Sequence, residues 1–114
     1  MTSYSRGDVV LVHFPFTSVT ASKQRRAIVI ASDQYSRTSP DVVIASVTSQ
    51  LNALPHSGDH VIADWQGAGL LRPSLFQTKI ATVEQSMIAR RLGRLGADDW
   101  TAVEVDLRAA LGRS

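Results

Sequence analysis

The fold of this chain is decided first by the stretch GDVVLVHFPFT, residues 7–17. A glycine turn leads into the apolar run Val9–Phe14, whose valines favour the extended backbone of a β-strand. Pro15 ends the strand, because proline has no N–H group to donate to a β-ladder. The stretch therefore predicts an apolar strand that stops sharply where a loop begins.

A second strand follows the loop and has basic residues at its start. Residues 17–24 are mostly small and polar and predict a mobile loop. Ala27–Ala31 is an apolar run of strand length with several β-branched residues. The basic residues are Lys23, at the end of the loop, and Arg25 and Arg26, directly before the strand. They place positive charge at one end of a two-stranded unit, an arrangement that suits binding of a polyanion.

The rest of the chain predicts more short strands and one helix. A turn is expected at 36–41, strands at 42–48, 60–63, 75–83 and 90–95, and a helical turn at 84–88. In the tail, Trp100, Val103, Leu107 and Leu111 recur at the spacing of one face of an α-helix. Gly96 is the expected N-cap and Gly112 the expected stop.

These elements predict one domain over residues 1–114, with a strand-rich part at about 7–95 and a helix at about 97–111. Several short strands with one amphipathic helix indicate a mainly β fold, a small and strongly bent sheet or barrel capped by the C-terminal α-helix.

Composition narrows the functional classes. The 114 residues contain no cysteine, so disulfides and zinc–thiolate sites are excluded. The start of the chain has no apolar segment typical of a signal peptide, and no run approaches the length of a membrane span. We therefore expect a cytoplasmic protein without membrane attachment. Residues 1–97 hold ten Lys or Arg against six Asp or Glu, a surplus that permits nucleic-acid binding.

Two positions are candidates for chemistry. Arg25 precedes an apolar strand, and a guanidinium on a rigid backbone can bind a phosphate through two donors. The alternative is that Arg25 and Arg26 are a solvated pair at a strand end. Thr48 opens a polar run at the end of the third strand, where hydroxyl and amide groups can bind phosphate oxygens or base edges. The alternative there is an ordinary turn.

Histidine and aromatic residues supply further hypotheses. His13 is a possible general base because histidine titrates near neutral pH. His56 and His60 are expected to be surface residues, and three scattered histidines show no metal-ligand spacing. Phe16 and Trp65 could stack on unpaired bases.

Five segments in order carry a resemblance to the MazF/PemK family of ribonuclease toxins from bacterial toxin–antitoxin pairs. They are residues 7–17, 25–31, 47–50, 70–74 (LLRPS) and 79–95 (KIAT running on to RLGRL). The resemblance implies an SH3-like barrel in which Arg25 is the catalytic arginine and Thr48 the catalytic threonine. The chain departs from the family at Arg26, where proline is usual.

The resemblance also implies an activity and partners. Family members cleave single-stranded RNA without a metal or other cofactor, leaving a 2′,3′-cyclic phosphate and a 5′-hydroxyl. They form homodimers and are inhibited by an acidic, MazE-like antitoxin. RNA-binding roles then go to Thr17, Lys23, Arg26, Ser49 and Gln50. The general acid and base are left unassigned. Alternative functions are a CcdB-like gyrase poison, disfavoured by the sequence Leu111–Ser114, or a non-catalytic nucleic-acid-binding module.

Overall fold

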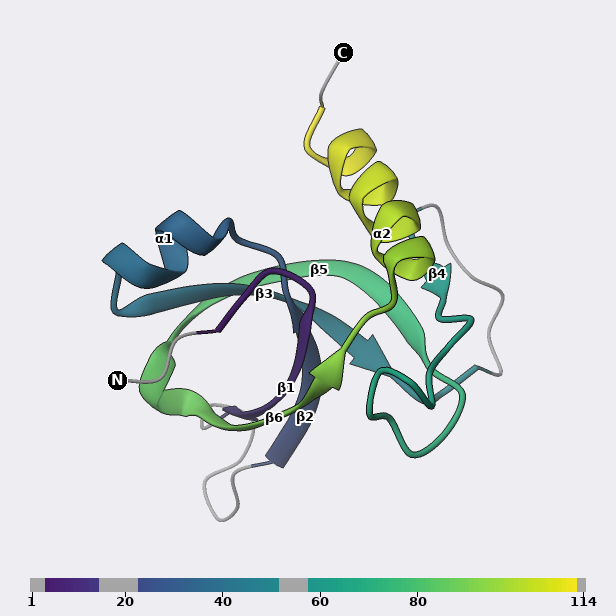
Figure 1. Cartoon of the computed structure of the whole chain (residues 1–114), viewed down its shortest axis with the longest axis horizontal. Helices are drawn as coiled ribbons and strands as arrows, with labels where there is room; N and C mark the ends of the chain where they lie inside the picture. The colour runs from purple at the N-terminus through teal and green to yellow at the C-terminus, as the bar shows by residue number, and fades with distance from the viewer. Residues whose placement is uncertain (1–3, 15–22, 52–57, 113–114) are drawn as a thin grey trace.

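The computed structural model describes residues 4–14, 23–51 and 58–112 of the chain. The elements, in chain order, are β1 (Asp8–Phe14), β2 (Lys23–Val29), α1 (Asp33–Thr38), β3 (Asp41–Thr48), β4 (His60–Val61), β5 (Leu75–Glu84), the short 3-10 helix η1 (Gln85–Met87), β6 (Ile88–Arg94) and α2 (Ala97–Ala110) (Figure 1). No helix in these described ranges is long and apolar enough to cross a membrane.

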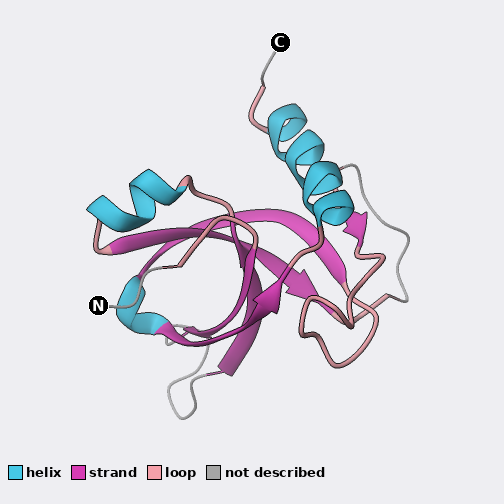
Figure 2. Ribbon diagram, in the orientation of Figure 1, coloured by secondary structure: helices cyan, strands magenta, loops and turns pink. Residues whose placement is uncertain are grey.

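The strands form one six-stranded antiparallel sheet in the order β4-β5-β3-β2-β1-β6. The β3–β5 and β1–β6 ladders both contain register shifts, which bend the strands and increase their twist. The sheet therefore curls, and β5, η1 and β6 form a continuous arch along one side of it (Figures 1 and 2). The edge strands β4 and β6 do not pair with each other in the described residues, so the barrel is not closed. The predicted mainly β, barrel-like fold with a C-terminal helix is confirmed.

Each face of the sheet carries its own apolar cluster. We call the cluster on the η1 side the inner core; it consists of Val10, Val12, Ala27, Val29, Val42, Ile44 and Ile88, with Tyr4 and Met87 packed against it. The outer core lies on the α2 side and includes Val9, Ile28, Ala45, Val47, Phe76, Val103 and Leu107. Side chains alternate between the two clusters along β1, β2 and β3, because successive residues of a strand point to opposite faces.

A buried carboxylate attaches α2 to the segment after β4. The Asp99 side chain accepts hydrogen bonds from the backbone N–H groups of Ala63 (2.8 Å) and Asp64 (2.9 Å), and its Oδ1 lies 2.8 Å from His60 Nε2. Burial on its own raises the pKa of Asp99, but the bonds from Asp64, Ala63 and His60 outweigh it and hold the pKa below its ordinary value. His60 was expected to be a surface residue; its side chain is instead only 23% exposed and is bound to Asp99.

The C-terminal helix is confirmed with one exception. Gly96 is its N-cap, and Gly112 has a φ of 77°, the left-handed conformation that ends helices. Val103 and Leu107 are buried, and Trp100 packs against the outer core. Leu111 is 71% exposed, because the helix has left the sheet by that point and its apolar face has nothing to cover there.

Three other predictions need correction. The first half of the turn expected at 36–41 belongs to helix α1, which Ser32 caps by accepting a hydrogen bond from the Tyr35 N–H. Lys23 and Gln24 belong to β2 rather than to a loop, because they pair with Phe14 and His13. Trp65 packs against the outer core instead of standing free for base stacking. Pro15, Phe16 and His56 lie outside the described residues.

Candidate nucleic-acid interface

The inner face of the sheet changes from apolar to polar at one end of the barrel. The series along three neighbouring strands are Val29, Ala27 and Arg25 in β2, Val42, Ile44, Ser46 and Thr48 in β3, and Val83, Ala81, Lys79 and Gln77 in β5. Each series follows every second residue, so its members lie on one face wherever the strand is regular. The inner core thus ends in a group of polar side chains that three strands contribute together.

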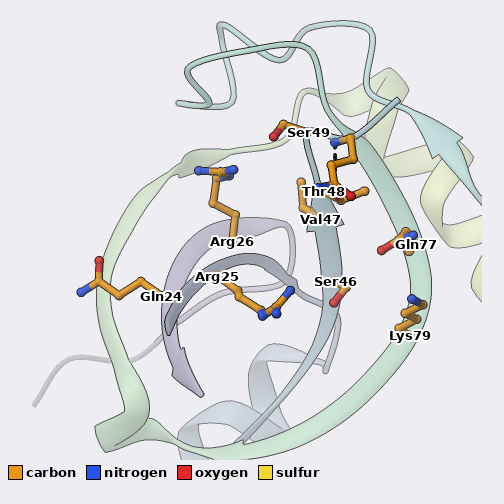
Figure 3. Close-up of a pocket in the computed structure, with 10 residues that line it drawn as sticks. Gln24, Arg25, Arg26, Ser46, Val47, Thr48, Ser49, Gln77 and Lys79 are labelled. Carbon is orange, nitrogen blue, oxygen red and sulfur yellow. Dashed lines mark hydrogen bonds between the residues drawn. The ribbon is translucent and has the colours of Figure 1, made fainter. Parts of the chain in front are cut away.

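This polar end is hollow. A cavity of about 660 Å³ opens there, lined by Gln24, Arg25, Arg26, Ser46, Val47, Thr48, Ser49, Gln50, Gln77 and Lys79. Figure 3 shows Arg25 extending toward the side of Ser46 and Lys79, whereas Arg26 extends in a different direction, toward Ser49. We call this cavity the cationic pocket.

The cationic pocket is suited to an anion. Arg25, Arg26 and Lys79 line it, and no Asp or Glu among the described residues does. Within the described residues, none of these three side chains forms an ion pair. Two guanidinium groups and an ammonium group therefore remain available to a ligand, and guanidinium matches the geometry of a phosphate through paired N–H donors.

Thr48 presents a hydroxyl with a defined orientation in the same pocket. Its Oγ1 accepts a hydrogen bond from the Gln50 N–H at 3.1 Å (dashed in Figure 3). A hydroxyl both donates and accepts, so this bond occupies one acceptor site of the oxygen and leaves its proton free to donate. The proton can bind a phosphate oxygen held by the arginines.

Five of the residues singled out from the sequence thus meet in one cavity: Arg25, Arg26, Thr48, Ser49 and Gln50. The backbone of Lys23 begins β2 opposite Phe14, and Thr17 lies outside the described residues. Sequence analysis missed Gln77 and Lys79. The sequence does contain an indication of them, because two long polar side chains two residues apart in a predicted strand share one face.

His13 lies on the other face of the sheet from Arg25. In the β1–β2 ladder, Val12 stands opposite Arg25 and His13 stands opposite Gln24, so the faces alternate. The His13 Nε2 atom is 3.4 Å from Gln24 Nε2, and His13 does not line the pocket. This position does not favour His13 as a base acting beside Arg25.

No three His, Asp or Glu side chains come together as a possible metal site in the part of the chain that the structure describes. The positive charge of the pocket comes from its arginine and lysine side chains.

The fold and the pocket together define a small, mainly β protein with a curled antiparallel sheet and a cationic pocket at one end of it. The chain belongs to the family of PemK-like, MazF-like toxins of type II toxin–antitoxin systems, whose sequence model matches residues 5–111. The predicted family membership is confirmed. No curated protein matches the chain.

Solved structures share the fold at low sequence identity. An endoribonuclease in complex with its cognate antitoxin, from a mycobacterial species, superposes with a TM-score of 0.80 at 15% identity and covers 98% of each chain. A chain of the MazE–MazF complex from Deinococcus radiodurans has a TM-score of 0.80 at 19% identity, with 100% of each chain covered. The Mycobacterium tuberculosis toxin MazF-mt6 has a TM-score of 0.72 at 15% identity, over 91% of this chain and 95% of that one.

Proposed function

We propose that this chain is an endoribonuclease toxin that cleaves single-stranded RNA in the cationic pocket. One observation carries the proposal: Arg25, Arg26 and Lys79 meet the Thr48 hydroxyl in a polar cavity that no acidic side chain of the described ranges lines. An RNA phosphate is an anion that this set of donors can bind. The similar structures described as endoribonucleases support the proposal.

In the proposed reaction the ribose 2′-oxygen attacks the adjacent phosphorus, and the bond from phosphorus to the 5′-oxygen of the next nucleotide breaks. The 2′-hydroxyl loses its proton and the leaving 5′-oxygen gains one, so the products are a 2′,3′-cyclic phosphate and a 5′-hydroxyl. Arg25 stabilises the negative charge that develops on the phosphorane oxygens, because its guanidinium stays protonated throughout. Thr48 donates to one of these oxygens and orients the phosphate.

The remaining lining residues bind RNA in this proposal. Arg26 adds a charge-assisted contact to phosphate, and Ser49 and Gln50 supply neutral donors and acceptors for base edges or sugar. Lys23, at the start of β2, and Thr17, earlier in the chain, also contact the RNA in this proposal. Gln77 and Lys79 add an amide and a positive charge from β5.

Incubation of the purified protein with a long single-stranded RNA in EDTA tests the reaction. We expect discrete fragments, whose 5′ ends a polynucleotide kinase labels without prior dephosphorylation. Acid treatment should open the cyclic phosphate at the 3′ ends. Cleavage that disappears in EDTA and returns with Mg²⁺ would refute the proposed chemistry.

We further propose that the protein acts in the cytoplasm as a homodimer controlled by an acidic, MazE-like antitoxin. A disordered acidic segment that folds on binding can occupy a pocket lined by arginine and lysine. Light scattering should give twice the chain mass of 12.4 kDa at micromolar concentration. The antitoxin should compete with RNA for the pocket, and its affinity for the toxin should fall as the salt concentration rises. A partner that binds RNA-loaded and RNA-free toxin equally well would exclude a shared site.

A further inference from the structure

A row of three side chains crosses the outer face of the sheet next to the cationic pocket. In the β1–β2 ladder Leu11 stands opposite Arg26, and in the β1–β6 ladder the same Leu11 stands opposite Arg90. Residues directly opposite in an antiparallel pair point to the same face. Arg26, Leu11 and Arg90 therefore lie side by side on one face, across three adjacent strands.

This row begins at Arg26, which projects to the face of β2 opposite Arg25, and leads away from the cationic pocket. Arg26 is itself a lining residue of the pocket. Neighbouring strands are about 4.8 Å apart, so the backbones of Arg26 and Arg90 are about 10 Å apart across β1. A chain of phosphates that binds Arg26 in the pocket can reach Arg90 by crossing a single strand.

Arg90 is available for such a contact, whereas its neighbours on β6 are engaged. Arg91 Nε and Arg94 Nε each donate to Oδ1 of the buried Asp8 at 3.1 Å. The side chain of Arg90 is exposed and forms no hydrogen bond or ion pair within the described residues. The β1–β6 ladder also places Arg90 and Arg91 on different faces of the sheet, because Arg91 stands opposite Val10, which belongs to the inner core.

We propose that Arg90 is a phosphate-binding residue of an extended RNA site, which continues from the cationic pocket over Leu11 to β6. The inference rests on the proposed function and deepens it, because it makes the substrate an RNA that extends beyond the cleaved bond. Half-buried Leu11, between two guanidinium groups, offers an apolar surface to one unpaired base. Guanidinium groups bind phosphate through two donors and also stack on bases.

The direction of the row favours RNA over an extended peptide. A peptide that pairs with the edge strand β6 lies alongside that strand, and its backbone bonds do not involve Arg26 or Leu11. The row crosses the strands instead. Arg26 and Arg90 lie one strand away from β1 on either side of it, so an RNA backbone that passes over β1 can contact both.

The test compares Arg90→Ala with Arg108→Ala. Arg108 is also an exposed arginine, 57% accessible on α2, so its loss changes net charge by the same amount. The cleaved bond is first mapped in a long RNA with the parental protein. The substrates are then a short oligonucleotide that just spans that bond, and versions extended by several nucleotides on the 5′ side, the 3′ side or both.

For Arg90→Ala we expect KM to rise about threefold on RNA extended on one side, with kcat unchanged. The short oligonucleotide should be cleaved as by the parent. The slope of log(kcat/KM) against log salt should fall in magnitude by about 0.7, the value for one phosphate contact to a single strand. Arg90→Lys should recover part of the loss, and Arg108→Ala should show none of these changes.

The outcomes separate the inference from the proposed function. If Arg90→Ala matches Arg108→Ala on every substrate, the extended site is refuted while cleavage in the pocket stands. If Arg90→Ala weakens the antitoxin complex and leaves RNA kinetics unchanged, the surface binds a protein and the RNA assignment is wrong. If the parental protein cleaves no RNA at all, the proposed function fails first and the inference fails with it.

Discussion

Replacing Asp99 with asparagine should destabilise the fold strongly, although it changes only one atom of the side chain. The carboxylate accepts bonds from Ala63 N at 2.8 Å and Asp64 N at 2.9 Å, and it pairs with His60 at 2.8 Å. Asparagine has one acceptor oxygen and an amino group in place of the other. In either orientation of the amide, the amino group faces at least one backbone N–H, and that donor loses its partner.

The size of the effect follows from the lost bonds. A hydrogen bond to a charged group contributes about 1.5–3 kcal/mol, and an unpaired buried donor costs about 1–3 kcal/mol. Because these two figures describe overlapping losses, we expect Asp99→Asn to lower the free energy of unfolding by about 2–4 kcal/mol. In a domain of this size that lowers Tm by roughly 8–16 °C.

The stability difference should also depend on pH in a defined direction. The pKa of Asp99 in the folded protein lies below the ordinary value of 3.8. The ionised carboxylate therefore stabilises the fold fully above that ordinary value, and the stabilisation is lost as pH falls through the folded pKa. The gap between parent and Asp99→Asn should be present at pH 7 and at pH 5, and should shrink below about pH 4.

Urea unfolding at a fixed protein concentration measures both effects. Asp98→Asn is the matched control, because Asp98 is the preceding residue, is exposed and carries the same charge. We expect Asp98→Asn to cost under about 0.5 kcal/mol, through its interaction with the helix dipole. The reasoning fails if the two variants unfold at the same urea concentration at pH 7, or if their gap is the same at pH 7 and pH 3.

Three further substitutions test the proposed site and the packing. Arg25→Ala should reduce RNA cleavage by about 10²–10³ in kcat with an unchanged unfolding midpoint, and cleavage at the parental rate would show that the site is misassigned. Thr48→Ala should lower kcat while Thr48→Ser retains most of it, because serine keeps the hydroxyl; equal losses in the two variants would argue against a role for that group. Gly93→Ala should lower the free energy of unfolding by about 2 kcal/mol or more, since a Cβ there collides with the carbonyl of Ala68. Gly96→Ala is its control, because nothing lies within 4 Å of the added atom and only the preference of an N-cap for glycine over alanine is lost. Similar losses in both variants would contradict the packing argument.

Much of the sheet could be predicted from the sequence, because local signals agree with the final fold. The apolar runs at Val9–Phe14 and Val42–Thr48 are strands within one residue of their predicted limits. Both strands are rich in valine, and their side chains pack alternately against the inner core and the outer core. Helix α2 was predictable for a similar reason, since its buried residues recur at helical spacing between two glycines.

The errors arise where distant residues decide the structure. Lys23 and Gln24 look like loop residues, yet pairing with β1 draws them into a strand. The bond between His60 and Asp99 joins residues 39 apart, which periodicity cannot show. Helix α1 is too short for an apolar period, although Ser32 followed by Asp33 is a recognisable N-terminal signal.

The candidate site shows the same division. Arg25 and Thr48 could be singled out, because each stands at the end of an apolar strand. Their proximity could not be read from spacing alone, since it depends on the β2–β3 register, in which Ala27 stands opposite Ser46. Lys79 was missed because β5 joins β3 from a distant part of the chain.

The position of β1 inside the sheet, next to the edge strand β6, has a consequence for synthesis of the chain on the ribosome. β1 lies between β2 and β6, and its Asp8 binds Arg94, which is 86 residues later. At about 5–20 residues per second, translation takes roughly 4–17 s to cover that interval. During this time the nascent chain has Arg25 on β2, but β1 beside it still lacks its partner strand β6. The arch through η1 does not yet exist. We therefore expect ribosome-bound chains that end before residue 88 to lack an assembled pocket, so that a newly made molecule becomes harmful only after its sixth strand has emerged.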